Sequence, residues 1–342
     1  MKTNKLTALM LATFILAVVI SGLIAKAGSF NFDSELTASE SASEDLITVG
    51  FSQIGSESVW RSANTSSIQN ALTRENGFFL KFQNARQKQD NQMKAIRSYI
   101  SQRVDFLVFA PVTEYGYETV LLEAKEAGIP VILVDRMVNV NDDSLYTAFL
   151  GTDKHEEGKK AGLWLAEYYK QEKQTEEPIN IVILRGTTGS SAEIGRTEGF
   201  MEIASAHKNW IVLDSVDADF TTAKGKEIME NFLKRFPDID VVVSQNDDMT
   251  FGAIEAINEA GLTTGVDGDI VIISYDATKQ ALSMVQQGII NVDIECNPLQ
   301  GDDLADILLR LKAGETVDKM NYIDEEVFTI DNVTDALDTR TY

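Results

Sequence analysis

Short apolar runs alternate with longer stretches of helical period from Ile47 to near the end of the chain. The apolar runs are rich in Val, Ile and Phe, which is typical of buried β-strands. They predict strands at 47–52, 79–82, 105–110, 131–134, 146–150, 179–184, 211–216, 240–244, 270–274 and 290–294. Helices are expected near 59–76, 88–102, 117–127, 154–169, 192–206, 222–236, 249–260, 278–287 and 299–313.

The strands and helices fall into two successive series, and the second begins after Pro178. Alternation of this kind predicts parallel sheets covered by helices on both faces. The length of 342 residues suits about two domains of ~100–200 residues each. We therefore expect an α/β chain of two doubly wound parallel-sheet lobes.

Polar side chains follow several predicted strands at the point where each strand ends. They are Asp135, Arg136, Gln245, Asn246, Asp247, Asp248, Asp276, Glu295 and Asn297. Ligands bind at the carboxyl ends of the strands in open α/β sheets, so these residues are expected to line a site. Carboxylates accept hydrogen bonds from hydroxyls, and amides and guanidinium groups donate them, so the set suits a neutral polyol. For any single pair, helix caps and solvated turns are the alternative.

The segment 49–61, Val-Gly-Phe-Ser-Gln-Ile-Gly-Ser-Glu-Ser-Val-Trp-Arg, joins the first predicted strand to the first predicted helix. Its serines supply capping oxygens, which places Trp60 and Arg61 in the first helical turn near a strand's carboxyl end. An indole face stacks on the C–H face of a sugar ring, and Phe220 offers a second flat wall. The alternative is that Trp60 belongs to the core and Arg61 is solvated.

The net charge of −23 argues against binding to nucleic acid or to an anionic membrane surface, because both need basic patches. The surplus of acidic residues is also explained by solubility alone. Catalytic patterns are missing: the two histidines, His155 and His207, have no metal-ligand spacing, and Cys296 has no nearby histidine. The glycine-rich stretch 186–191 lacks the form of a phosphate loop. We therefore expect no catalytic residue, no cofactor and no metal.

The amino-terminal residues differ in character from the rest. Lys2 and Lys5 precede an apolar run that ends in Ala25-Lys26-Ala27, which predicts a secretory signal over 1–27 with cleavage near Ala27. A retained membrane anchor is the alternative, because the apolar run is nearly long enough to span a bilayer. Residues 28–45 are rich in Ser, Glu, Asp and Ala and predict an acidic disordered lead-in.

Taken together, several segments resemble the sugar-binding, type I periplasmic substrate-binding proteins of ABC transporters, and among them the galactofuranose-binding branch. The matching segments are 50–61, 87–97 (Gln-Lys-Gln-Asp-Asn-Gln-Met-Lys-Ala-Ile-Arg), 110–112, 123–131, Asp135-Arg136, Asp219-Phe220 with Lys224-Gly225-Lys226, and Asn246-Asp-Asp-Met249. They cover nearly the whole chain after the predicted signal.

The resemblance implies two lobes joined by three crossovers, the second near Asn297 and the third near Tyr322. The amino-terminal lobe would comprise 46–150 and 297–322, and the carboxyl-terminal lobe 151–296 and 323–342. By the same resemblance, the ligand-binding residues are Glu57, Trp60, Arg61, Asp135, Arg136, Arg196, Phe220, Asn246, Asp276 and Glu295. Glu295 is preferred to Asn297 at the last position, where this chain reads Glu-Cys-Asn-Pro.

The resulting hypothesis is a monomeric periplasmic protein that captures a monosaccharide between its lobes and delivers it to an ABC permease, its only membrane contact. A sensory protein that presents the sugar to a chemoreceptor or sensor kinase is the alternative from a different class. An α/β hydrolase is disfavoured because a nucleophile and base are missing. A transcription regulator of this fold would need a basic helix-turn-helix domain at the amino end. The particular sugar, its ring form and its anomer are left open.

Overall fold

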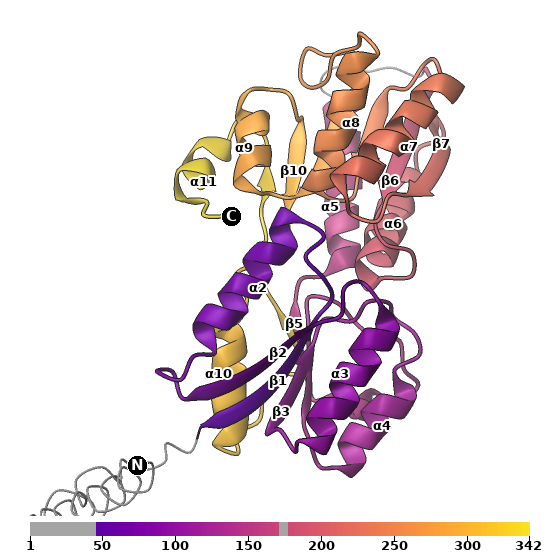
Figure 1. Ribbon diagram of the computed structural model, residues 1–342. Helices are drawn as coiled ribbons and strands as arrows, with labels where there is room; N and C mark the ends of the chain where they lie inside the picture. Colours follow the sequence, from indigo (N-terminus) through magenta and orange to yellow (C-terminus); the bar gives the residue numbers. More distant parts are fainter. Residues whose placement is uncertain (1–45, 171–176) are drawn as a thin grey trace, which may run out of the picture. The chain divides into compact units, whose positions relative to one another are not determined.

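The computed structural model describes residues 46–170 and 177–342, and the predicted signal and acidic lead-in lie outside the described residues. The described chain contains two six-stranded sheets (Figure 1). The first sheet holds β1 (Ile47–Gln53), β2 (Phe78–Asn84), β3 (Phe106–Phe109), β4 (Val131–Val134), β5 (Ala148–Gly151) and β11 (Met320–Tyr322). The second holds β6 (Ile179–Arg185), β7 (Trp210–Asp217), β8 (Val241–Ser244), β9 (Val271–Asp276), β10 (Val292–Glu295) and β12 (Val327–Phe328).

Helices cover both faces of each sheet, which is why the strands are apolar on both sides. In the first lobe α2 (Val59–Ala71) and α10 (Gly301–Lys312) pack on one face, and α3 (Gln89–Ser101) and α4 (Glu118–Glu126) on the other. In the second lobe α5 (Lys154–Tyr168) and α6 (Ser191–Ala204) oppose α7 (Thr222–Arg235), α8 (Asp247–Glu259) and α9 (Lys279–Gln286). Within the described residues, every helix is too short or too polar to span a bilayer. The prediction of two parallel-sheet α/β lobes is confirmed.

The strand order is β11-β5-β4-β3-β1-β2 in the first sheet and β12-β10-β9-β8-β6-β7 in the second. The pairs are parallel except that β12 runs antiparallel to β10. This strand enters the second sheet from the first lobe, so it starts at the carboxyl ends of its neighbours and runs against them. The chain pattern did not predict β11 or β12, because both are shorter than the usual strand. It also missed the last helix, α11 (Val333–Thr339), and a 3₁₀ turn, η1 (Asp143–Leu145).

The first predicted helix is shorter than expected, because it ends at Ala71 instead of near residue 76. The side chain of Asn76 donates a hydrogen bond of 2.8 Å to the carbonyl of Ala71. Gly77 follows with a φ of +85°, a conformation that favours glycine. The polar residues at the end of the predicted helix therefore form the turn that leads into β2.

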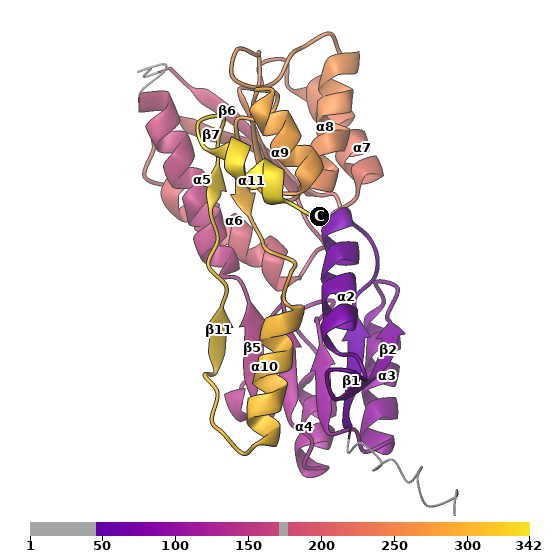
Figure 2. The same ribbon diagram turned by 90° about the vertical axis from the view of Figure 1, so that its left-hand side faces the viewer.

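Three segments connect the two sheets: 152–153, 296–300 and 323–326. They lie beside one another, as Figure 2 shows for the strands and helices that flank them. Ile323 N donates to the carbonyl of Gly151 at 2.8 Å. Asn297 N donates to Glu325 Oε1 at 3.2 Å. We call these segments the first, second and third crossover.

Candidate functional site

A cavity lies between the lobes, at the carboxyl ends of their parallel strands. It encloses about 300 Å³ of space free of protein atoms, part of which is open to solvent. Side chains of both lobes and of the second crossover line it: Glu57, Ser58, Trp60, Arg61, Asp135, Arg136, Lys154, Ala192, Arg196, Phe220, Asn246, Asp276 and Cys296.

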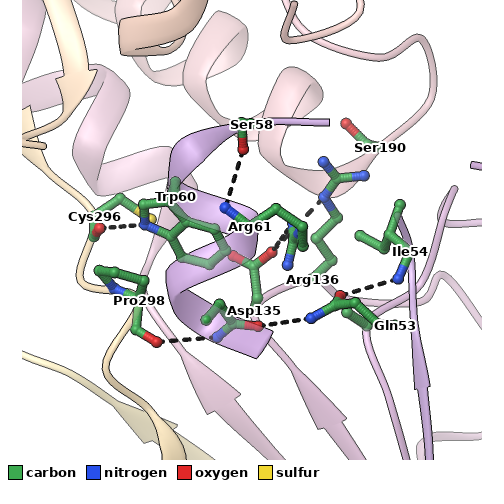
Figure 3. Close-up of polar contacts among 12 residues, drawn as sticks. Gln53, Ile54, Ser58, Trp60, Arg61, Asp135, Arg136, Ser190, Cys296 and Pro298 are labelled. Atoms are coloured by element: carbon green, nitrogen blue, oxygen red, sulfur yellow. Dashed lines mark hydrogen bonds and ion pairs between the residues drawn. The ribbon is translucent and has the colours of Figure 1, made fainter. Parts of the chain in front are cut away.

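Trp60 and Arg61 form the wall contributed by the first turn of α2 (Figure 3). Ser58 caps this helix by accepting a hydrogen bond from Arg61 N at 3.0 Å. The indole Nε1 of Trp60 donates to the carbonyl of Cys296 at 2.5 Å, which ties the ring to the second crossover. The guanidinium of Arg61 lies 4.7 Å from the Trp60 ring centroid. Arg61 is only 2% exposed, which excludes the alternative of a solvated helix residue.

Asp135 lies at the centre of the positive charges of the cavity. One oxygen is 2.7 Å from Arg61 Nη2 and 3.9 Å from Arg136 Nε, and the other is 3.3 Å from Lys154 Nζ. Burial alone would raise the pKa of this carboxyl, but the charges of Arg61, Lys154 and Arg136 outweigh burial and hold its pKa well below the usual range. Asp135 is therefore a carboxylate at physiological pH.

Arg196 dominates the wall formed by the second lobe. Its Nε donates to Glu157 at 2.6 Å, and its Nη2 lies 3.3 Å from Asp276. Its Nη1 donates to the backbone carbonyl of Gln245, at the end of β8. Burial lowers the pKa of this guanidinium, but the opposing charges, above all that of Glu157, raise it well above its ordinary value.

Two buried carboxyls hold Asp276 in place. Asp276 and Ala277 have φ values of +109° and +53°. Asp293 accepts a hydrogen bond from Ala277 N at 3.1 Å, and Asp247 accepts one from Thr278 N at 2.8 Å. Burial raises the pKa of both carboxyls. Asp247 raises the pKa of Asp293 further, whereas the hydrogen bond with Asp293 lowers that of Asp247, an arrangement that favours a proton held between them. The turn at the end of β9 is thus fixed from behind.

Residues with unfavourable backbone conformations gather at this cavity. Of the eight non-glycine residues with positive φ in the described chain, five line the cavity or directly adjoin a lining residue. They are Asp135, Asp219, Phe220, Asp276 and Ala277. Strained conformations of this kind cost roughly 1–3 kcal/mol each and cluster at functional sites. This clustering marks the cavity as the functional site.

Several polar atoms around the cavity are buried and have no hydrogen-bond partner within the described chain. Three of them belong to lining residues: Glu57 Oε2, Arg61 Nη1 and Arg136 Nε. An unsatisfied buried donor or acceptor costs about 1–3 kcal/mol. One acceptor and two donors are therefore available to a ligand that carries hydroxyl groups.

The formal charges of the site cancel. The lining holds four cations and three carboxylates, and Glu157, directly behind the lining, supplies the fourth negative charge. The acidic residues are Glu57, Asp135, Asp276 and Glu157, and the basic residues are Arg61, Arg136, Lys154 and Arg196. Burial raises the pKa of Asp276 well above its ordinary value, although the charge of Arg196 opposes this. Such a site does not require a charged ligand, since its ions already have partners.

Residues 49–316 match the family model of the periplasmic binding protein domain. The chain belongs to this periplasmic binding protein family. Known members are binding proteins and not enzymes, which confirms that the chain is not an enzyme.

Individual relatives are similar over most of the chain. The galactofuranose-binding protein YtfQ of Escherichia coli is 39% identical over 86% of this chain and 91% of its own length. A Mycobacterium smegmatis protein solved in complex with β-D-fucofuranose is 45% identical, with a TM-score of 0.82 over 86% of this chain and 94% of its own. The arabinose-transporter component of Shewanella sp. ANA-3, bound to α- and β-L-arabinofuranose, is 39% identical, with a TM-score of 0.79 over 86% of this chain and 95% of its own.

In this periplasmic binding protein, nine of the ten side chains predicted to bind the ligand line the one cavity. Glu295 is outside the lining, where it pairs with Arg340 at 2.6 Å and accepts from Glu326 N at 3.0 Å. Side chains alternate between the two faces of a strand. At the end of β10 the side chain of Glu295 therefore points toward the carboxyl-terminal segment. The side chain of the next residue, Cys296, points the other way and lines the cavity. Asn297, the other candidate at this position, also lies outside the lining.

Four lining residues are not among the predicted ligand-binding residues: Ser58, Lys154, Ala192 and Cys296. Lys154 follows β5, and the rule of polar residues after strand ends would have selected it had it been applied there. Cys296 was considered only as a nucleophile. Its exposure to the cavity follows from the path of the second crossover, which the sequence pattern did not fix.

Gly186 is predicted to be essential for the position of the Phe220 ring. A Cβ atom on Gly186 would lie 1.8 Å from the tip of this ring. Gly186→Ala should therefore displace the Phe220 ring. The guanidinium of Arg136 lies 5.2 Å from the centroid of this ring, so it should move as well. Ligand binding should weaken by about tenfold as a result. Titration calorimetry measures the loss. Equal binding by Gly186→Ala and wild type would contradict the prediction.

Proposed function

We propose that this protein is an exported receptor that encloses one neutral monosaccharide in furanose form and delivers it to an ABC permease. The observation that carries the proposal is the set of unpartnered buried atoms of Glu57, Arg61 and Arg136 in a cavity of balanced charge. Hydroxyl groups both donate and accept, so a polyol can satisfy a carboxylate oxygen and guanidinium nitrogens together. An ion would upset the balance of charge.

Two aromatic side chains supply the apolar part of this site. Trp60 on the first lobe and Phe220 on the second both line the cavity. Sugar rings have apolar C–H faces, and aromatic rings cover such faces while their edges stay free for polar contacts. The ligands named for the relatives, galactofuranose, fucofuranose and arabinofuranose, are five-membered rings and support a furanose here.

Contacts between the lobes indicate a closed conformation. Met137 N donates to Ser191 Oγ at 2.9 Å, and Glu114 N donates to the carbonyl of Gly189 at 2.8 Å. Each contact joins a residue of the first lobe to one of the second. We expect the lobes to open about the three crossovers to admit the sugar, and the ligand to favour closure by its contacts to both walls.

Transport is favoured over sensing because the relatives include importer components. We propose that the chain acts as a monomer in the periplasm, is freed there by cleavage near Ala27, and meets the membrane only through the permease. Mass spectrometry of the exported protein tests the cleavage site. A mature chain that still carries residues 1–27 would favour the anchored alternative.

The test of the ligand is titration calorimetry of the purified protein against a panel of pentoses and hexoses. The panel should pair furanose-locked methyl glycosides with the corresponding pyranosides. We expect binding of at least one furanose at micromolar concentration or below, and at least tenfold weaker binding of the matched pyranoside. No heat from any sugar would overturn the proposal, and a preference for the pyranoside would overturn its furanose part.

Asp248 is predicted to make the stability of this conformation depend on pH. Its carboxylate on the second lobe accepts a hydrogen bond of 3.2 Å from Val59 N, at the start of α2 on the first lobe. Burial, with help from the carboxylates of Asp247 and Glu57, raises the pKa of Asp248 to about 6. Because its pKa is higher in the folded state, protonated Asp248 contributes to the free energy of unfolding. This contribution is complete below the pKa of the unfolded state, ~3.9, and is lost as the pH rises through about 6.

Relative to Asp248→Asn, the wild-type protein should therefore gain thermal stability as the pH falls from 7.5 to 5. Thermal unfolding at half-unit steps of pH measures the difference. Asp267→Asn, an exposed substitution on the second lobe, serves as the control. A difference between wild type and Asp248→Asn that stays constant over this range would refute the prediction.

A further inference from the structure

Lys154 is the most connected cation of the cavity. It is the first residue of α5, directly after the first crossover, and it is 7% exposed. Its ammonium lies 2.6 Å from Thr152 Oγ1, 3.2 Å from Glu157 Oε1 and 2.9 Å from Cys296 Sγ. It also lies 3.3 Å from Asp135 of the first lobe. One nitrogen therefore contacts both lobes and two of the crossovers.

Glu157 continues this line of charges into the second lobe. It is fully buried one turn along α5, with one oxygen on Lys154 and the other 2.6 Å from Arg196 Nε. The sequence of ion pairs runs from Asp135 through Lys154 and Glu157 to Arg196. We call these four residues the ionic chain. Both of its ends line the ligand cavity, one on each lobe.

The third crossover reaches the same point. Side-chain atoms of Glu325, Glu157 and Cys296 lie within 4.8 Å of one another. Burial raises the pKa of Glu325 to about 10 and raises that of the Cys296 thiol, so both are uncharged at neutral pH. Three such groups have the spacing of metal ligands. The Lys154 ammonium already contacts two of them, however, and would repel a metal ion.

Stability alone does not account for the ionic chain. Buried ion pairs are often replaced by packed apolar side chains at no cost in stability, because desolvation offsets the attraction between the charges. The pairs do fix geometry, since charged partners that are shielded from water have few alternatives. The ionic chain would hold its two end residues, Asp135 and Arg196, at a fixed distance and orientation. Such a role explains why four ionised groups meet at the hinge.

We propose that Lys154 and Glu157 are positioning residues that couple ligand binding to closure, by holding Asp135 of one lobe and Arg196 of the other in the geometry that the ligand needs. The inference rests on the proposed function, since it concerns the same site. Lys154, Glu157 and Arg196 lie on helices of the second lobe, whereas Asp135 follows β4 of the first. The contact between Lys154 and Asp135 is therefore the link that breaks when the lobes separate.

The first experiment compares sugar affinities by calorimetry. Lys154→Met and Glu157→Gln should each weaken binding of the best furanose by about tenfold or more, because each removes one ion pair of the ionic chain and with it the link between Asp135 and Arg196. Lys159→Met and Glu156→Gln are matched controls on the same helix. They alter an exposed pair with the same three-residue spacing, 3.1 Å apart, and should stay within about twofold of the wild type.

The second experiment uses the single cysteine of the chain as a reporter of closure. Saturating sugar should slow alkylation of Cys296 by iodoacetamide by about tenfold or more in the wild type, because a closed cavity excludes the reagent. In Lys154→Met at saturating sugar most of this protection should be lost, an effect that a merely structural role would not produce. Circular dichroism checks folding. Glu157→Gln, which keeps the side-chain shape, carries the test if Lys154→Met does not fold.

The results of these experiments distinguish a failure of the proposed function from a failure of the coupling role. If the wild type binds no sugar, the proposed function fails and the role of the ionic chain fails with it. If the wild type binds and closes but the Lys154 and Glu157 variants match their controls in affinity and in protection of Cys296, the coupling role alone is overturned. Weaker binding with full protection would also overturn it, since it would show that closure does not depend on the ionic chain.

Discussion

Asp135→Asn should strongly destabilise the fold. It removes the negative charge that Arg61, Lys154 and Arg136 share and leaves these cations buried together. Breaking a buried ion pair by removing one partner costs about 3–5 kcal/mol of folding free energy. Denaturant unfolding of the sugar-free protein measures this loss. A loss of sugar affinity of about 10–100-fold should accompany it, because a hydrogen bond from a hydroxyl to a charged group contributes about 1.5–3 kcal/mol.

The pH dependence gives this prediction a second readout. The pKa of Asp135 is held well below its usual range, so its contribution to stability is complete above the unfolded value of ~3.9 and is lost only as the pH falls further. The difference in stability between wild type and Asp135→Asn should therefore be constant from pH 5 to 8 and shrink below about pH 4. Asp142→Asn, at an exposed carboxylate that pairs with Lys125, is the control. A difference under about 1 kcal/mol at pH 7 would show that the cations find other partners.

Substitution of Trp60 should cause the largest loss of sugar affinity, and two variants separate the contributions to that loss. Trp60→Phe keeps an aromatic face but leaves the carbonyl of Cys296 without its donor, at a cost of about 1–3 kcal/mol in the closed form. Trp60→Ala also removes the face that covers the ligand and opens a void, which raises the total to about 3–5 kcal/mol. Sugar affinity should thus fall by about tenfold for Phe and by about 100-fold or more for Ala.

Calorimetry on both variants and on Trp164→Ala measures these steps. Trp164 lies on α5 outside the cavity lining, so its loss should affect stability but not sugar affinity. An equal loss for Trp60→Phe and Trp60→Ala would assign the whole effect to the hydrogen bond with the second crossover. Unchanged affinity in both would remove Trp60 from the ligand site.

The sequence predicted those parts of the molecule that local patterns determine. Strands such as β4 are buried on both faces and read as continuous apolar runs, so their positions were recovered closely. The same holds for polar residues at strand ends, since a parallel sheet brings its carboxyl ends to one edge. Asp135 and Asp276 were found in this way, on different lobes and without knowledge of the fold.

Features that depend on contacts distant in the chain were not predictable from local patterns. β12 is two residues long and exists because it pairs with β10. Glu295 was misplaced because its partner, Arg340, arrives from the last residues of the chain. Lys154 follows the end of β5, but its contacts with Cys296 and Asp135 arise only from segments distant in the chain.

The positive φ angles at the cavity restrict how its chemistry can be altered. Among residues that carry a carboxylate, aspartate tolerates the left-handed region better than longer side chains, because its short polar group bonds locally. Asp135 has a φ of +64° and Asp276 one of +109°, so backbone and side chain both select aspartate there. Redesign for another ligand would meet less resistance at Glu57 or Arg61, where ordinary dihedral angles leave the choice of side chain open.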